Sequence, residues 1–452
     1  MKISKRFFGL VAAAMLAVNA LAQTMMFTYA SGVTATASEM ADGSWLMQLP
    51  AGTDLNKAIT GVIVNGTAVT AKDVVPNPTE TLITDGEIET FVYDGKAYSF
   101  RFIAGQYFTV VMFSDPHVDN ENIKNTIANQ VANIVNMGKD GGKVVTFDKG
   151  PKGLVPTADI VFCLGDMDED KEEDASSPGQ YYLDATAAFN KAGIPFISLL
   201  GNHDLAPDYW TGKDGGYGLT AGTGGVYYND KSIEIVKKHL EQAKTNGISD
   251  VNVFKDSDLG SKVTQCEQFA FKFKGVRFYV GHTYWFQKPY SGSYAEAFGT
   301  VLSKPTYYAA DGVIDALNTY VDNHKDEPSV WMQHYPFVYG SDCNRWWVDQ
   351  NDVGRFIMPT DASSSAYYTS DKSYTEGNPD VDTKKNKLAE IINKTKSNTQ
   401  TNSHVHFSGH VHSSKTESFK GITDYTIGQP GKAYVVLCKE GVGVIEVKEV
   451  TF

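Results

Sequence analysis

The chain has few cysteines, no excess of positive charge and no long apolar run beyond its first residues. Its 452 residues include only four cysteines, Cys163, Cys266, Cys343 and Cys438, and none of them has the spacing of a metal site. Four cysteines allow three disulfide pairings, but Cys163 and Cys438 lie in apolar, strand-like runs that suit buried free thiols equally well. The sequence therefore excludes a disulfide-rich scaffold and a cysteine-ligated metal centre.

Positive charge is scarce, because the net charge is −13 at pH 7. Residues 1–22 contain Lys2, Lys5 and Arg6 and no acidic residue, so the charge without them is −16. Such a surface does not attract nucleic acid through its long-range field, and we expect no nucleic-acid polymer as a partner. No stretch after residue 22 is long and apolar enough to span a membrane. The oligomeric state is left open.

The first residues match a secretory signal peptide. The three basic side chains precede an apolar run over 7–18, and Ala20-Leu21-Ala22 follows as a small-x-small cleavage site. Gln23 is then the predicted mature N-terminus, with no cysteine after it for a lipid anchor. We expect a periplasmic, cell-surface or secreted protein. An uncleaved N-terminal anchor is the alternative.

The remaining chain is long enough for a large and a small domain. Residues 23–105 contain short segments broken by Gly, Asn and Asp, which predicts a small all-β, sandwich-like domain. Residues 106–452 alternate apolar strand-length runs with helical patterns, which predicts an α/β domain with a partly parallel sheet. Two segments, 205–262 and 338–383, do not show this alternation, and segments of that length are typical of lids or insertions.

Polar residues follow five predicted strands of the second domain directly. In open α/β sheets, ligands bind beyond the carboxyl ends of the strands, so these residues should meet at one edge. Imidazole and carboxylate together favour zinc, iron, manganese and related ions. The residues concerned are Asp115 and His117, then Asp166, then Asn202, His203 and Asp204, then His334, and finally His410 and His412.

The ordered motifs D-x-H, G-D-x-x-[DE], G-N-H-[DE], a separate His and G-H-x-H occur in this chain in that order. Residues 107–447 therefore resemble the calcineurin-like metallophosphoesterase superfamily, with Glu169 in the fourth place after Gly165. The resemblance implies two mixed β-sheets packed as a sandwich and flanked by helices. It also implies a dinuclear metal site at one edge of the sandwich.

The resemblance further implies which residues bind which metal. One ion would be held by Asp115, His117, Asp166 and His412, and the other by Asp166, Asn202, His334 and His410, with Asp166 bridging. His203 would lie beside the bound phosphate to stabilise charge or protonate the leaving oxygen. Asp204 would orient His203 or cap a helix.

These expectations describe an exported phosphoesterase with two divalent or trivalent ions such as Zn, Mn, Fe or Mg. A metal-bridging hydroxide would attack the phosphate ester in line. A phosphodiesterase acting on nucleotides, lipid head groups or glycans is the alternative, and a non-catalytic surface binding protein is a third reading. Because Glu169 stands where purple acid phosphatases carry a tyrosine, and because His117 is present, we expect no purple iron–tyrosinate centre.

Other conspicuous residues receive plainer interpretations. His239 and His324 lie in charged, helical stretches and are predicted to be solvated, and His282 is predicted to be an ordinary hydrogen-bonded histidine. The acidic run at Asp168, Asp170 and 172–174 is predicted to be a solvated loop. The aromatic stretches 283–290 and 342–350 suit either a pocket wall or simple loop packing.

The segment His404-Val-His-Phe-Ser-Gly-His-Val-His412 contains two H-V-H pairs that should differ in role. His410 and His412 follow the turn-forming Gly409, where neighbouring imidazoles can serve different metals. His404 and His406 precede it on the strand, on the face opposite Val405 and Phe407. We therefore predict that this first pair supports the structure or contacts the ligands, without binding metal itself.

Overall fold

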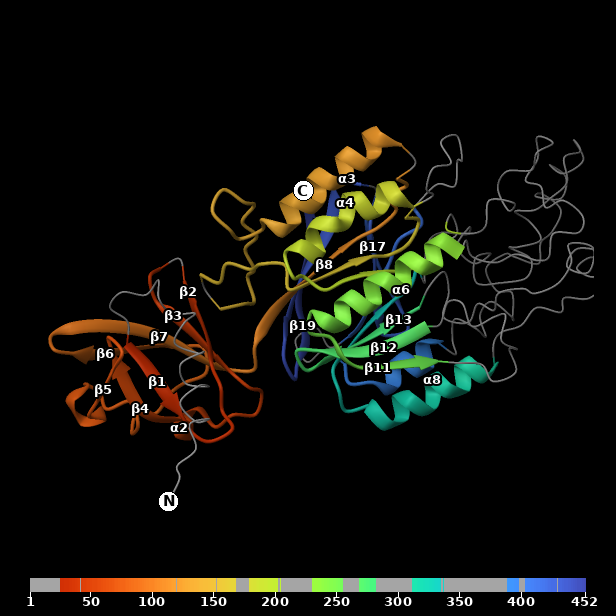
Figure 1. The fold of residues 1–452 in the computed structure, drawn as a ribbon. Helices are drawn as coiled ribbons and strands as arrows, with labels where there is room; N and C mark the ends of the chain where they lie inside the picture. Colours follow the sequence, from red (N-terminus) through yellow and green to blue (C-terminus); the bar gives the residue numbers. More distant parts are fainter. Residues whose placement is uncertain are drawn as a thin grey trace, which may run out of the picture. The chain divides into compact units, whose positions relative to one another are not determined.

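The computed structural model describes residues 25–40, 42–118, 120–151, 153–167, 179–201, 204, 230–254, 268–281, 311–334, 336, 388–397, 403–428 and 430–452 (Figure 1). The predicted signal peptide and its cleavage site lie outside these residues. The chain divides into two compact units, one of Met1–Gln106 with Pro151–Leu154 and one of Tyr107–Gly150 with Val155–Phe452.

The first unit is built from short strands in two sheets. One sheet has the order β1-β4-β5 and the other the order β2-β3-β7-β6. Phe27, Phe91, Phe100 and Phe102 pack together in a common core, with ring centroids 4.8–6.4 Å apart. Its elements are β1 (Met25–Tyr29), β2 (Thr36–Glu39), β3 (Trp45–Leu49), α2 (Leu55–Ala58), β4 (Ile59–Val64), β5 (Thr67–Val69), the 3-10 helix η1 (Ala71–Asp73), β6 (Ile88–Tyr93) and β7 (Lys96–Ala104).

The second unit contains two mixed sheets, a five-stranded one of order β10-β9-β8-β18-β19 and a seven-stranded one of order β11-β12-β13-β14-β15-β17-β16. The strands are β8 (Tyr107–Phe113), β9 (Ile160–Cys163), β10 (Phe196–Ser198), β11 (Ser249–Phe254), β12 (Gln268–Phe273), β13 (Val276–Val280), β14 (Ser329–Met332), β15 (His404–Ser408), β16 (Lys415–Phe419), β17 (Ile422–Thr426), β18 (Lys432–Lys439) and β19 (Gly443–Thr451). The helices are α3 (Glu121–Val135), α4 (Gln180–Lys191), α6 (Asp230–Thr245) and α8 (Asp311–His324).

The two sheets of this unit share one hydrophobic core. Met112 and Phe162 from the five-stranded sheet lie in the same buried cluster as Phe278, Met332 and Phe407 from the seven-stranded sheet. The sheets therefore pack face to face, and the prediction of a mixed α/β architecture with mixed sheets is confirmed. Each sheet contains a run of neighbouring parallel strands: β10, β9 and β8 in the five-stranded sheet, and β13, β14, β15 and β17 in the seven-stranded sheet.

Helices cover the outer faces of both sheets. In α3 the side chain of Asn120 caps the first turn by accepting from the backbone N–H of Ile123 at 3.0 Å. Ile127, Val131 and Ile134 then form a buried stripe with the 3.6-residue period, as the sequence predicts. Helix α4 packs beside α3 against the five-stranded sheet, and α8 packs against the seven-stranded sheet.

The structure bears on the predictions for one segment, two histidines and the cysteines. The segment 205–262, which shows no strand–helix pattern, contains α6 and β11. His239 on α6 is not solvated but 4% exposed, because its ring packs on Phe196. His324 is only partly buried. Cys163 and Cys438 are buried free thiols, whereas Cys266 and Cys343 lie outside the described residues. None of the helices in the described ranges has both the length and the hydropathy that crossing a bilayer requires.

Candidate metal centre

Four of the five predicted strand ends bring described ligand side chains to one edge of the sandwich. Asp115 and His117 follow β8, Asp166 follows β9, His334 follows β14, and His410 and His412 follow β15. Because β8 and β9 are parallel neighbours, as are β14 and β15, their carboxyl ends open at the same edge. Six candidate ligands from four separate strands therefore converge.

These six residues form two overlapping groups. Asp115, His117, Asp166 and His412 each offer one ligand atom within 4.8 Å of the others, and Asp166, His334 and His410 form a second group by the same measure. Asp166 is the member that the groups share. A set of carboxylates and imidazoles in two groups suits a pair of divalent ions with a bridging carboxylate, so the donor chemistry fits metal binding.

Five of the candidate ligands have a strained, left-handed backbone conformation that sets the directions of their side chains. Asp115, His117, Asp166, His410 and His412 have φ between 41° and 73°, and they account for half of the ten non-glycine residues with positive φ in the described ranges. Each such residue costs about 1–3 kcal/mol and persists only where the surrounding structure enforces it. The left-handed conformation turns the chain sharply after each strand and so directs consecutive side chains into one space.

Backbone hydrogen bonds connect the strand ends directly. The N–H groups of Asp115 and His117 donate to the carbonyl oxygens of Gly165 and Asp166, each at 3.1 Å. Across the two sheets, the carboxylate of Asp115 accepts from the backbone N–H of His410 at 3.0 Å. The approach is very close at Gly409, where a Cβ would lie 1.9 Å from Oγ of Ser114. Ser114, which the sequence analysis does not single out, thus explains why glycine precedes the final motif.

The ring of His334 is oriented by its environment. Its Nδ1 lies 2.7 Å from the carbonyl oxygen of Leu164 and therefore carries the proton that it donates there. Its Nε2 is left to face Oδ2 of Asp166 at 3.2 Å. Burial of the ring lowers its pKa, but the nearby carboxylates of Asp166 and Asp115 outweigh that effect and raise the pKa to about 9. The electrostatic field of this edge therefore favours a cation.

His117 and His412 face each other on the more accessible side of the edge. Their Nε2 atoms are 3.0 Å apart, and Nε2 of His412 lies 3.4 Å from Oδ1 of Asp115. The hydrogen bond to Asp115 raises the pKa of His412, although partial burial lowers it. Two imidazole nitrogens that point at one another beside carboxylates are arranged as ligands of a common ion would be.

Asp204 is 1% exposed, and its carboxylate holds the loops in place. It accepts from the backbone N–H groups of Gly201 at 2.7 Å, Asp166 at 3.0 Å and Met167 at 3.1 Å. These bonds tie the end of β10 to the turn that presents Asp166. Its contact with His203 is not described, because Asn202 and His203 lie outside the described residues, as do Glu169, the acidic run, His282 and the two aromatic stretches.

The first H-V-H pair lies on β15, away from both ligand groups. Nδ1 of His406 is 2.8 Å from Oδ1 of Asp424, and Nδ1 of His404 is 3.3 Å from Oγ1 of Thr395. Val405 and Phe407 point into the core on the opposite face of the strand. Asp424 is not among the residues predicted from the sequence. It could have been found as a carboxylate that alternates with Ile422 and Thr426 on the buried face of β17.

No protein-family model and no curated protein matches the chain. Solved structures resemble it weakly. A purple acid phosphatase from yellow lupin (Lupinus luteus) seeds is 13% identical with a TM-score of 0.33, and the match covers 81% of this chain and 60% of that one. A dimetal phosphatase from Danio rerio is 12% identical with a TM-score of 0.38, covering 76% and 99%.

A putative 5'-nucleotidase from Staphylococcus aureus is 14% identical with a TM-score of 0.34, and the match covers 76% of this chain and 54% of that one. The chain thus spans 60% and 54% of the lupin and staphylococcal proteins it matches. These likenesses are too distant to carry a residue role to this chain.

Proposed function

We propose that this protein is a metal-dependent phosphoesterase that hydrolyses phosphate esters at the edge formed by the ends of β8, β9, β14 and β15. The observation that carries the proposal is the pair of ligand groups that meet at Asp166, whose side chain is 1% exposed. A shared, buried carboxylate between two sets of imidazoles is the arrangement that two neighbouring divalent ions require.

We assign Asp115, His117, Asp166 and His412 to one ion and Asp166, His334 and His410 to the other, with Asn202 completing the second set. Two bound divalent ions would supply Lewis acidity toward the phosphoryl oxygens and activate water for attack. The chain's own contribution is orientation: Leu164 fixes the tautomer of His334, and the strained backbone fixes the directions of the aspartates.

His203 is proposed to donate a hydrogen bond to the phosphate or a proton to the leaving oxygen. Asp204 is proposed to support this role indirectly, because its carboxylate holds the backbone N–H groups of Asp166 and of Gly201, which lies two residues before His203 in the sequence. If His203→Ala kept full turnover of an ester with a poor leaving group while metal content stayed intact, this role would be wrong.

The experiment for the proposal is a substrate panel measured on protein reconstituted with Zn, Mn, Fe or Mg. Hydrolysis of p-nitrophenyl phosphate in excess over bis-p-nitrophenyl phosphate supports a monoesterase. The reverse preference supports a phosphodiesterase. If no ester is hydrolysed after reconstitution with any of these metals, and metal content stays near zero, the protein is a non-catalytic binding protein instead.

Export is also proposed, on the strength of the basic residues, apolar run and cleavage site over residues 1–22. N-terminal sequencing of protein made from the full gene tests it directly. A mature chain that begins at Gln23 supports export, and a retained Met1 in a cytoplasmic fraction contradicts it.

A further inference from the structure

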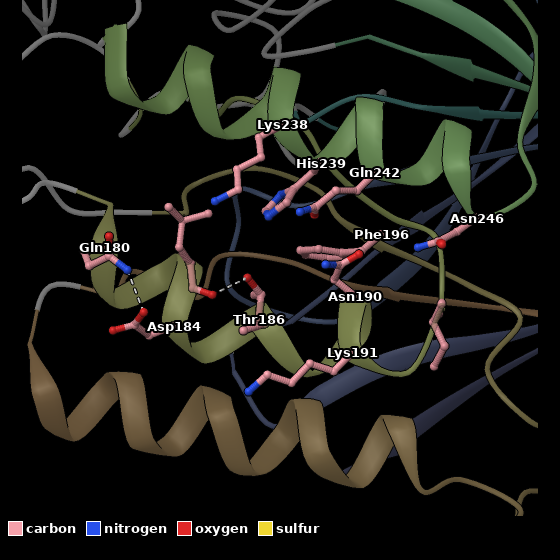
Figure 2. Close-up of a pocket in the computed structure, with 13 residues that line it drawn as sticks. Gln180, Asp184, Thr186, Asn190, Lys191, Phe196, Lys238, His239, Gln242 and Asn246 are labelled. Atoms are coloured by element: carbon pink, nitrogen blue, oxygen red, sulfur yellow. Dashed lines mark hydrogen bonds between the residues drawn. The ribbon is translucent and has the colours of Figure 1, made fainter.

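A second site lies outside the candidate metal centre, in a cavity between α4 and α6. Its volume is about 240 Å³, somewhat below the range of about 300–1,000 Å³ that drug-sized ligands occupy, so it suits a molecule of one ring. Figure 2 shows Asn190 and Lys191 on the α4 side, Lys238, His239 and Gln242 on α6, and Phe196 from β10 between the two helices.

His239 faces this cavity as a neutral ring. Its side chain is 4% exposed, and burial together with the nearby charge of Lys238 lowers its pKa to about 3. Nδ1 of the ring is 2.9 Å from Oγ of Ser198. Within the described ranges, the structure gives the other ring nitrogen, Nε2, no hydrogen-bond partner.

Two buried hydroxyls hold the ring of His239 in place. The hydroxyl of Tyr182 lies 2.7 Å from Oγ of Ser198, and Oγ of Ser198 lies 2.9 Å from Nδ1 of His239. Either group of each pair can donate, so these hydrogen bonds position the neutral ring in both of its tautomers. Nε2 is then an uncharged donor in one tautomer and an uncharged acceptor in the other, and a ligand hydroxyl complements both.

The other lining groups narrow the ligand class. Lys191 and Lys238 outnumber the one lining carboxylate, Asp184, whose Oδ1 already accepts from Gln180 at 2.6 Å. This leaves one positive charge in excess, on a protein whose net charge is −13. Side-chain amides that both donate and accept complement hydroxyl groups, which do the same. The partly buried side chains of Leu183 and Ile194 add an apolar surface against which the C–H face of a sugar can pack.

We propose that the cavity between α4 and α6 binds a hexose derivative with one anionic group, and that a sugar hydroxyl forms a hydrogen bond with Nε2 of His239. The anionic group contacts Lys191 and Lys238, and the amides of Asn190 and Gln242 contact the remaining hydroxyls. A sugar acid and a sugar phosphate share this chemistry, and the binding experiment separates them. The proposal is independent of the metal centre.

The test uses the full chain and four probes: glucuronate, glucose 6-phosphate, glucose and inorganic phosphate. Side-chain ¹⁵N NMR follows His239, because the Nε2 chemical shift of a neutral imidazole moves when that nitrogen gains a hydrogen-bond partner. We expect a shift with glucuronate, with glucose 6-phosphate or with both, which identifies the anionic group. We expect little shift with glucose and none with phosphate. If neither anionic sugar moves the Nε2 chemical shift at about 10 mM, ten-fold above a dissociation constant of about 1 mM, the proposal is overturned.

Matched variants on α6 locate the binding. Lys238→Gln removes a lining cation, whereas Lys244→Gln removes a cation that pairs with Glu241 outside the cavity. The first should weaken binding of the anionic sugar about ten-fold, and the second should leave it unchanged. Asn190→Asp, which keeps the shape and adds a negative charge, should weaken it similarly. Equal affinity in all three variants would place the sugar elsewhere and overturn the proposal.

Discussion

Asp166 is the residue on which the candidate metal centre depends most. Its carboxylate belongs to both ligand groups, its backbone φ is 53°, and its N–H is held by the buried carboxylate of Asp204. This edge concentrates two buried carboxylates and several imidazoles, and the carboxylates raise the pKa of His334. These residues form a donor set that suits divalent metal ions, and the backbone that presents them is strained.

Asp166→Asn should abolish binding of at least one metal equivalent and reduce turnover by more than about 100-fold, because the loss of an outer partner alone costs about 10–100-fold. Elemental analysis of the reconstituted protein measures the first effect. Asp148→Asn is the matched control, since that side chain is 88% exposed and pairs with Lys448, which is not a candidate ligand. Unchanged metal content in Asp166→Asn would show that the Asp166 carboxylate is not a metal ligand.

His239 should make the protein sensitive to acid. Its pKa is about 3 in the folded chain and about 6.5 in an unfolded one. Between these values the unfolded state binds more protons, so the free energy of unfolding falls as pH falls, by up to about 1.4 kcal/mol per pH unit for this residue. Above pH 6.5 the contribution is complete and constant.

Denaturant unfolding of wild type and His239→Phe between pH 4 and pH 7 measures this difference. Phe keeps an aromatic ring but cannot be protonated, so its unfolding free energy should fall less steeply toward pH 4. Parallel pH profiles of the two proteins would show that His239 titrates normally.

The two H-V-H pairs, one on strand β15 and one in the turn that follows it, have different predicted roles. His406→Ala should lower the free energy of unfolding by about 3 kcal/mol, because the buried carboxylate of Asp424 loses a partner that lies 2.8 Å away. The same variant should keep its full metal content. Loss of a whole metal equivalent in elemental analysis would make His406 a ligand.

The turn after β15 tolerates only glycine at position 409. Gly409→Ala would place a Cβ 1.9 Å from Oγ of Ser114 and 2.7 Å from Oδ2 of Asp115, so it should lower the free energy of unfolding by about 1–3 kcal/mol and weaken metal binding. Gly61→Ala, whose Cβ meets only the side chain of Thr28, is the control. Thermal unfolding and metal titration of both variants check this, and equal behaviour of the two would contradict the close approach.

At the scale of elements, periodicity predicts α3 because its buried stripe repeats every three to four residues. The strands that precede Asp115 and Asp166 are predictable because they are short, apolar and followed by polar motifs. The sequence shows a charged, helical stretch around His239, but the extent of α6 is not predictable because the helix is polar on average and lies among Gly- and Tyr-rich residues. The burial of His239 is not predictable for a different reason: its partners Ser198 and Phe196 are some forty residues away in sequence and meet it only through tertiary packing.

At the scale of the whole molecule, the candidate ligands all belong to the second unit, and the first unit has its own aromatic core. A metal ion that binds only the folded state stabilises the unit to which it binds. The stabilisation is about 2.7 kcal/mol when the metal concentration is a hundred times the dissociation constant. Added metal should therefore raise the unfolding temperature of one calorimetric transition and leave a second one unmoved. A uniform shift of both transitions would show that the two units unfold together.

The most direct test of the central claim is to measure phosphate-ester turnover and metal content on the same samples as metal is titrated into the chelated protein. We predict no turnover without metal and a rise in turnover that saturates near two equivalents, because Asp166 joins two ligand groups. Full turnover in excess chelator, or none when two equivalents are bound, would contradict the account.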